Sequence, residues 1–107
     1  MTGWVYVIGS PNSRTVKIGV TVDLVRRLRE IQNLSPVELK VLWSVPGGPA
    51  LEQALHDHFS EIRSHGEWFT FASDPVQAVQ AAIEGGSIVL PPPLASGEAP
   101  LQAAAAF

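Results

Sequence analysis

The sequence predicts a single α/β domain in which a small mixed, largely antiparallel sheet is flanked by helices, with the elements in the order ββαβαβα. Two short β-branched runs joined by turn residues open the chain, which is the pattern of a hairpin. Apolar residues then recur at helical spacing, and strand-like and helix-like stretches alternate as far as residue 86. A chain of 107 residues supports one domain. We expect it at residues 1–86, followed by a Pro- and Ala-rich, partly flexible C-terminal tail at 87–107.

The first strand is expected at residues 4–8 and the second at 15–20, joined by the turn-forming residues 9–13. Both sides of the first strand are largely apolar, so we expect it to be central in the sheet. Tyr6 in this strand carries a hydroxyl that needs a partner or water. Lys17 interrupts the second β-branched run, which marks it as either an exposed-face residue or a site residue.

The first helix is expected at residues 23–34, with Thr21 or Asp23 as its cap. Its buried stripe is apolar: Leu24, Leu28 and Ile31. Arg27 lies beside this stripe near the sheet, where a guanidinium suits bidentate contact with a phosphate. The alternative is a surface ion pair with an acid such as Glu30, which contributes little stability. Gly19, just before the helix, leaves room for backbone or substrate to approach closely.

Alternating residues predict a third strand with one strongly apolar face: Leu39, Val41, Trp43 and Val45. A second helix is expected at residues 49–64. Glu52, His56 and Arg63 then share one stripe of this helix, because offsets of four and seven residues repeat on one helical side. The stripe presents a carboxylate, an imidazole and a cation together.

The last two elements are a fourth strand at residues 67–71 and a helix that starts at Asp74-Pro75 and ends at Gly85. Trp68 and Phe71 in the strand are either core residues or stacking platforms for bases, and core packing is the more frequent role.

The charge is uneven along the chain, although the net charge of −3 does not suggest a nucleic-acid binder. Residues 1–40 carry a balance of +3 and residues 41–107 a balance of −6. A basic N-terminal face could meet phosphate; the alternative is that helix arginines solvate an outer face. The candidate phosphate-binding residues are Lys17, Arg26, Arg27, Arg29 and Arg63. With no cysteine, no secretory signal and no stretch long enough for a membrane span, we expect a cytoplasmic protein.

Five short segments occur in a recognisable order: Trp-Val-Tyr at 4–6, Lys-Ile-Gly at 17–19, Arg27, Glu-x-x-x-His at 52–56 and Gly-Glu-Trp-Phe at 66–69. The ordered set resembles the GIY-YIG nuclease superfamily, and within it a phage-type branch labelled as DNA-binding. The resemblance covers roughly two-thirds of the chain. It implies a metal-dependent DNA endonuclease that hydrolyses phosphodiester bonds.

The resemblance also assigns roles to residues. Glu52 would hold one Mg²⁺ or Mn²⁺, and a carboxylate suits magnesium, which prefers oxygen ligands and keeps several waters. Tyr6 would touch the attacking water and Arg27 the phosphate, while His56 could orient water, touch phosphate or assist Glu52. Lys17 stands where the family usually has a tyrosine. A protonated lysine cannot accept a proton, but it can hold a phosphate as a point charge.

Two alternatives stay open beside the nuclease. The missing second tyrosine, and the lack of an asparagine late in the domain, would fit a nucleic-acid-binding module that does not cleave. The net acidity would fit a protein-interaction domain that lost the chemistry. A homodimer or a helper protein is a hypothesis without direct support in the sequence. The histidines do not suggest zinc, because His56 and His58 point about 200° apart on a helix.

Overall fold

The computed structural model describes residues 3–86 and 88. In this part of the chain five strands form one sheet in the order β3-β1-β2-β5-β4, and each neighbouring pair is antiparallel. The elements are β1 (Trp4–Gly9), β2 (Thr15–Thr21), α1 (Leu24–Gln32), β3 (Lys40–Pro46), α2 (Pro49–His58), the 3₁₀ turn η1 (Ser60–Ile62), β4 (Arg63–His65), β5 (Trp68–Thr70) and α3 (Pro75–Glu84). The predicted α/β class is confirmed. None of the helices in the described residues has the length and apolar character needed to span a membrane.

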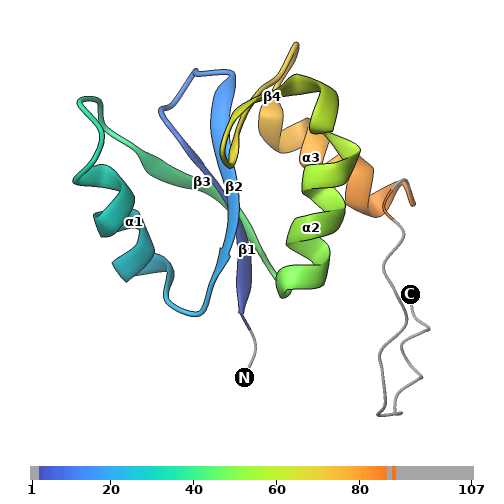
Figure 1. The fold of residues 1–107 in the computed structure, drawn as a ribbon, viewed down its shortest axis with the longest axis horizontal. Coiled ribbons are helices and arrows are strands. Elements are labelled where there is room, and N and C mark those ends of the chain that lie inside the picture. The colour runs from blue at the N-terminus through green and yellow to red at the C-terminus, as the bar shows by residue number, and fades with distance from the viewer. Residues whose placement is uncertain (1–2, 87, 89–107) are drawn as a thin grey trace.

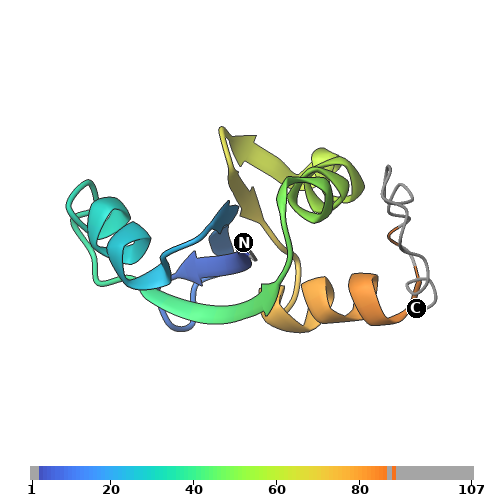
Figure 2. The same ribbon diagram turned by 90° about the horizontal axis from the view of Figure 1, so that it is seen from below.

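The helices divide between the two sides of the sheet. In both views α1 lies on one side and α2 and α3 lie on the other (Figures 1 and 2). The side chains of β1 serve both layers, because successive residues point to opposite faces. Val5 and Val7 belong to the core under α2 and α3, and Tyr6 and Ile8 to the core under α1. All four are fully buried, as expected of a central strand.

A β-bulge divides the third strand between these two cores. Val7 of β1 pairs with Trp43, but the next residue, Ile8, pairs with Val41, so Leu42 is the extra residue. The extra residue changes the side to which the strand's side chains point. Val41 therefore packs in the α1 core with Ile8, whereas Trp43 packs in the core under α2 and α3. The prediction of one apolar face along this strand is wrong for this reason.

The second helix is shorter than predicted. It ends at His58 and is followed by η1 and β4, so Arg63 lies in a strand and not on the helical stripe of Glu52 and His56. Phe59 follows the last residue of α2, and the centre of its ring lies 4.9 Å from that of Phe71. Arg63 pairs with Phe69 of β5 in a hairpin that the sequence pattern did not predict.

The last helix begins and ends as predicted. The Asp74 carboxylate accepts hydrogen bonds from the backbone N–H groups of Val76 and Gln77, which caps α3. Ile88 packs against the core under α2 and α3, and its N–H donates to the carbonyl of Ala82 over 3.2 Å. The tail predicted at 87–107 otherwise lies outside the described residues.

Candidate functional site

A buried tyrosine and a helical arginine meet on the α1 side of the sheet. Arg27 Nη1 donates to the Tyr6 hydroxyl over 3.3 Å, and Arg27 Nε donates to Glu30 Oε1 over 3.2 Å. Asp23 caps the helix by accepting from the Arg26 N–H, which fixes the turn that carries Arg27. Burial raises the pKa of the Tyr6 phenol above its ordinary value, although the hydrogen bond from Arg27 opposes the shift. Tyr6 is therefore a neutral phenol at neutral pH.

Gly19 makes room for the Tyr6 ring. The two residues are partners in the β1–β2 ladder. A Cβ on Gly19 would come within 2.6 Å of Tyr6 Cζ, closer than real Cβ contacts. The space beside Gly19 is thus filled by the tyrosine, and not by backbone or substrate as the sequence suggested. The same contact fixes the position of the phenol under Arg27.

Lys17 lies two residues before Gly19, so its side chain leaves the same face of β2. Its Nζ is 3.1 Å from Glu67 Oε1 and 5.7 Å from the centre of the Trp68 ring. The lysine side chain is 19% exposed and that of Glu67 is 39% exposed. Sequence reasoning did not single out Glu67 for a role, although it lies in the Gly-Glu-Trp-Phe segment.

His56 joins α2 to β2 at the point where β5 stops pairing. The ladder between β2 and β5 covers only residues 15–17 of β2. Beyond it, the Ile18 N–H donates to the carbonyl of Glu67. The Ile18 carbonyl accepts from His56 Nε2 over 2.8 Å in a buried bond. Because a carbonyl only accepts, Nε2 carries a proton, and Nδ1 is the ring nitrogen left for other contacts.

Glu52 lies one turn before His56 on the same side of α2. Within residues 3–86 and 88, no hydrogen bond or ion pair of its carboxylate is found. Burial raises the pKa of the Glu52 carboxyl above its ordinary value of 4.5, and Glu67 raises it further. His56, Lys17 and Arg27 oppose this rise. The structure therefore brings these side chains within electrostatic reach of one another.

The remaining predicted cations are not part of this group. Arg26 is 74% exposed and pairs with Glu30 over 3.3 Å, and Arg29 is exposed on the same helix. Arg63 lies apart in β4, where its Nε donates to the Gly66 carbonyl and its guanidinium lies over the ring of Phe69. Arg63 is thus not an extension of the Glu52 and His56 stripe.

The metal-binding potential of this group is modest. No cluster of three or more His, Asp or Glu side chains suited to a metal ion occurs in the described part of the chain. A site here would depend on the half-buried Glu52 carboxylate, with water as the other ligands. Magnesium accepts this arrangement, since it often binds through one or two carboxylates and keeps several waters.

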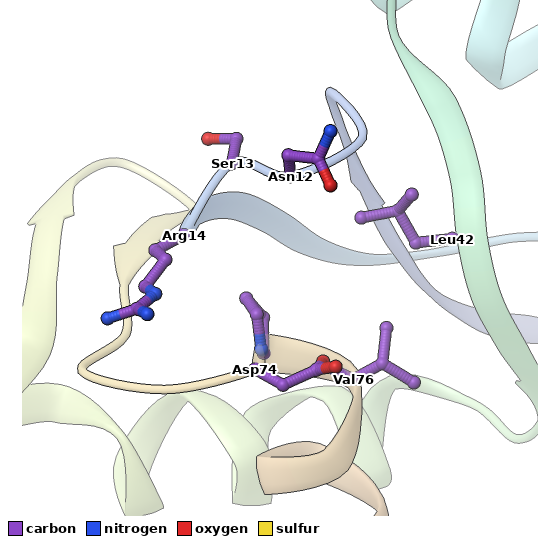
Figure 3. A pocket seen from close by; sticks show the side chains of 7 residues that line it. Asn12, Ser13, Arg14, Leu42, Asp74 and Val76 are labelled. Atoms are coloured by element: carbon purple, nitrogen blue, oxygen red, sulfur yellow. The ribbon is translucent and has the colours of Figure 1, made fainter.

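A cavity of about 390 Å³ lies elsewhere, between the β1–β2 loop and the start of α3 (Figure 3). Its walls come from seven residues: Asn12, Ser13, Arg14, Leu42, Asp74, Pro75 and Val76. Two of its charged groups already serve the fold, because Arg14 donates to the Ala72 carbonyl and Asp74 caps α3. The cavity is therefore not part of the candidate site.

The comparison with protein families decides the identity of the domain. The model of the T5orf172 domain matches residues 3–84, which spans every element from β1 to α3. The chain belongs to the T5orf172 domain family. No curated protein and no solved structure matches it significantly. Membership of the T5orf172 family points to a nucleic-acid-related function, and it does not by itself extend to the GIY-YIG superfamily or to metal-dependent cleavage.

Proposed function

We propose that this T5orf172 domain is a divalent-metal-dependent DNA endonuclease of GIY-YIG type that hydrolyses phosphodiester bonds. The observation that carries the proposal is the contact between Arg27 and Tyr6. The Glu52 carboxylate, which has no hydrogen bond or ion pair among the described residues, is coupled to it electrostatically. Residues from β1, α1 and α2 therefore influence one another electrostatically. Coupled ionisable groups with shifted pKa values often occur at functional sites.

Tyr6 serves this reaction as a hydrogen-bonding group. Its oxygen accepts from Arg27, and its side chain is fully buried, so it acts on the reaction through Arg27. Because burial raises its pKa, the phenol does not act as a base at neutral pH. Its role is to hold the Arg27 guanidinium in position for the phosphate.

Arg27 and Lys17 supply the positive charge. The Arg27 guanidinium suits the non-bridging oxygens of a phosphodiester, where charge develops during attack by water. Lys17 holds the phosphate as a point charge. Both cations have carboxylate partners in the free protein, Glu30 for Arg27 and Glu67 for Lys17. Both pairs are partly exposed and contribute little, so a phosphate can replace them.

Glu52 is the residue that would hold the metal ion. Its carboxylate is half buried, and its pKa is raised by burial and by Glu67, so a nearby divalent cation would stabilise its charged form. Bound Mg²⁺ or Mn²⁺ would supply Lewis acidity and a water of lowered pKa. His56 supports this arrangement by fixing α2 to β2.

The favoured alternative is a module of the same fold that binds nucleic acid without cleaving it. Lys17 at the position of the second tyrosine, paired with Glu67, supports it. A protein-interaction domain is the second alternative, and exposed apolar side chains on and after α1, such as Val25 and Leu34, support it. A homodimer, a helper protein and a cytoplasmic location stay predictions.

Cleavage of plasmid and branched DNA tests the proposal. The purified protein is incubated with Mg²⁺, with Mn²⁺ and with chelator, beside Glu52→Ala and the matched control Glu61→Ala, whose carboxylate is exposed on η1. We expect metal-dependent nicking that is lost in Glu52→Ala and kept in Glu61→Ala. Equal activity of Glu52→Ala and wild type would remove the site assignment. Retention of DNA without cleavage in any metal would select the binding module.

A further inference from the structure

A small cavity adjoins the phosphate-binding candidate Lys17. It has a volume of about 160 Å³ and is lined by Lys17, Ile31, Leu34, Ser35 and Trp68. From the sequence, Trp68 and Phe71 were each either a core residue or a stacking platform for bases. The structure places the two side chains in different surroundings. Phe71 is 5% exposed in the core under α2 and α3, whereas Trp68 is only partly buried and forms a wall of the cavity.

We propose that this cavity receives one unpaired nucleobase, which stacks on Trp68 while Lys17 holds a neighbouring phosphate of the same strand. The inference rests on the nucleic-acid binding in the proposed function and not on cleavage. It specifies the preferred substrate as a strand with at least one unpaired base. Aromatic side chains beside a cationic groove are the usual means of holding single strands.

Two further residues that line the cavity are apolar, and one of them is exposed to solvent. Leu34 follows the end of α1 and is 88% exposed, the most exposed of the large apolar side chains in the described residues. Ile31 also lines the cavity and is buried. A flat base inserted against Trp68 would cover part of Leu34, and burial of this apolar surface favours binding.

The polar groups in the cavity do not provide a pattern for reading base identity. The Ser35 hydroxyl donates to the Val37 carbonyl over 2.9 Å and accepts from the Val37 N–H over 3.2 Å. Lys17 is engaged by Glu67 or, in the complex, by a phosphate. Stacking is tolerant of sequence because every base has a π-face. We therefore expect a preference for unpaired bases with little preference among them.

A paired duplex fits this cavity poorly. A base must leave its stack to reach Trp68, and unstacking it from a duplex costs free energy that a single strand does not lose. A cation beside the tryptophan agrees with a nucleic-acid strand as the occupant, because Lys17 Nζ lies 5.7 Å from the ring centre. An apolar protein segment would offer Lys17 no anion to bind in place of Glu67.

Equilibrium binding to fluorescently labelled oligonucleotides tests the inference. The full chain is titrated in chelator, so that no cleavage interferes, against a short oligothymidine, the same strand with abasic positions, and the matched duplex. We expect the intact single strand to bind more tightly than the duplex and the abasic strand. This comparison uses only the wild-type protein and does not depend on how a variant folds.

Trp68→Leu identifies the stacking residue. We expect it to weaken binding of the single strand by about 5- to 150-fold, the range for loss of one base–aromatic stack, and to abolish the difference between intact and abasic strands. Trp4→Leu is the matched control, because Trp4 is also partly exposed but does not line this cavity.

Three results would overturn the inference: equal affinity for intact and abasic strands, equal effects of Trp68→Leu and Trp4→Leu, or no binding of any strand. Cleavage by the wild-type protein separates the two proposals. A base-dependent affinity in a wild-type protein that cleaves no DNA with Mg²⁺ or Mn²⁺ would reject the nuclease and keep the base-binding cavity.

Discussion

His56 donates through Nε2 to the carbonyl oxygen of Ile18, 2.8 Å away, and so occupies a hydrogen-bonding position of β2 that β5 does not reach. The imidazole also packs 5.1 Å from the ring of Phe69. One side chain therefore joins α2 to β2 and covers a backbone group that would otherwise be buried without a donor. Since Glu52 lies one turn earlier on α2, this bond also sets where its carboxylate sits.

Replacement of His56 should lower the free energy of unfolding, and the loss should be larger when the new side chain has no hydrogen-bond donor. His56→Ala leaves the Ile18 carbonyl without its partner, which should reduce the free energy of unfolding by about 1–3 kcal/mol. His56→Gln keeps an amide donor and should lose less. Urea denaturation measures both, with His65→Ala, an exposed histidine in β4, as the control. If His56→Ala and His65→Ala were equally stable, the hydrogen bond from His56 to Ile18 would not stabilise the fold.

Gly19→Ala should be destabilising because the new methyl group meets the Tyr6 ring. Overpacking of this kind costs about 1–3 kcal/mol. Gly48→Ala is a matched control, since a Cβ at Gly48 meets nothing within 4 Å. Thermal and urea unfolding of the two variants would show the difference. A Gly19→Ala protein as stable as Gly48→Ala would mean that the phenol moves aside freely.

Glu52→Gln should change the dependence of stability on pH. The Glu52 pKa is higher in the folded protein than its ordinary 4.5, so the folded state holds this proton to higher pH than the unfolded state. Ionisation therefore destabilises wild type as pH rises from about 4.5 through the raised folded pKa. The stability of Glu52→Gln relative to wild type should increase over this window and then level off. Urea denaturation from pH 4 to pH 8 measures it.

Added magnesium extends this comparison. The ion should raise the melting temperature of wild type at neutral pH, since binding only to the folded state stabilises it. It should leave Glu52→Gln unchanged, and the effect on wild type should fade as acid protonates Glu52. Glu61→Gln is the control for loss of one exposed carboxylate. Equal magnesium shifts in Glu52→Gln and wild type would contradict a metal at Glu52.

Glu67→Gln should increase the affinity for nucleic acid by several-fold. The Glu67 carboxylate pairs with Lys17 in the free protein, and a phosphate must replace it. The neutral Gln side chain no longer pairs with Lys17, so Lys17 is available to a phosphate. The slope of log affinity against log salt should therefore become steeper by up to about one unit. Glu61→Gln changes the net charge equally. An equal gain in both variants would assign the effect to net charge and not to Lys17.

The sequence predicted the elements whose signals are local. The hairpin, α1 and α3 follow from turn residues, helical spacing and the caps Asp23 and Asp74, all of which act within a few residues. The β4–β5 hairpin lacked such a signal, because its strands have three residues each and all of β4 is exposed. Ile62 continues the apolar spacing of α2, so the sequence extended that helix too far.

The candidate site was predicted in part. Tyr6, Lys17, Arg27, Glu52 and His56 were chosen from the sequence, and the structure brings them within electrostatic reach of one another, while their chemical roles stay predictions. Two features depend on contacts between distant segments and could not be read locally. The partner of Lys17 is a residue 50 positions later. The acceptor of His56 is a backbone atom, which no residue type reveals.

The bulge at Leu42 makes β3 a component of both hydrophobic layers. Residues on one side of the bulge pack beneath α1, and those on the other side pack beneath α2 and α3. If either layer separated from the sheet, the same strand would lose part of its burial in the other. We therefore expect the two layers to unfold in one cooperative transition, so that a ligand bound beside α1 protects the amides of α3 as well.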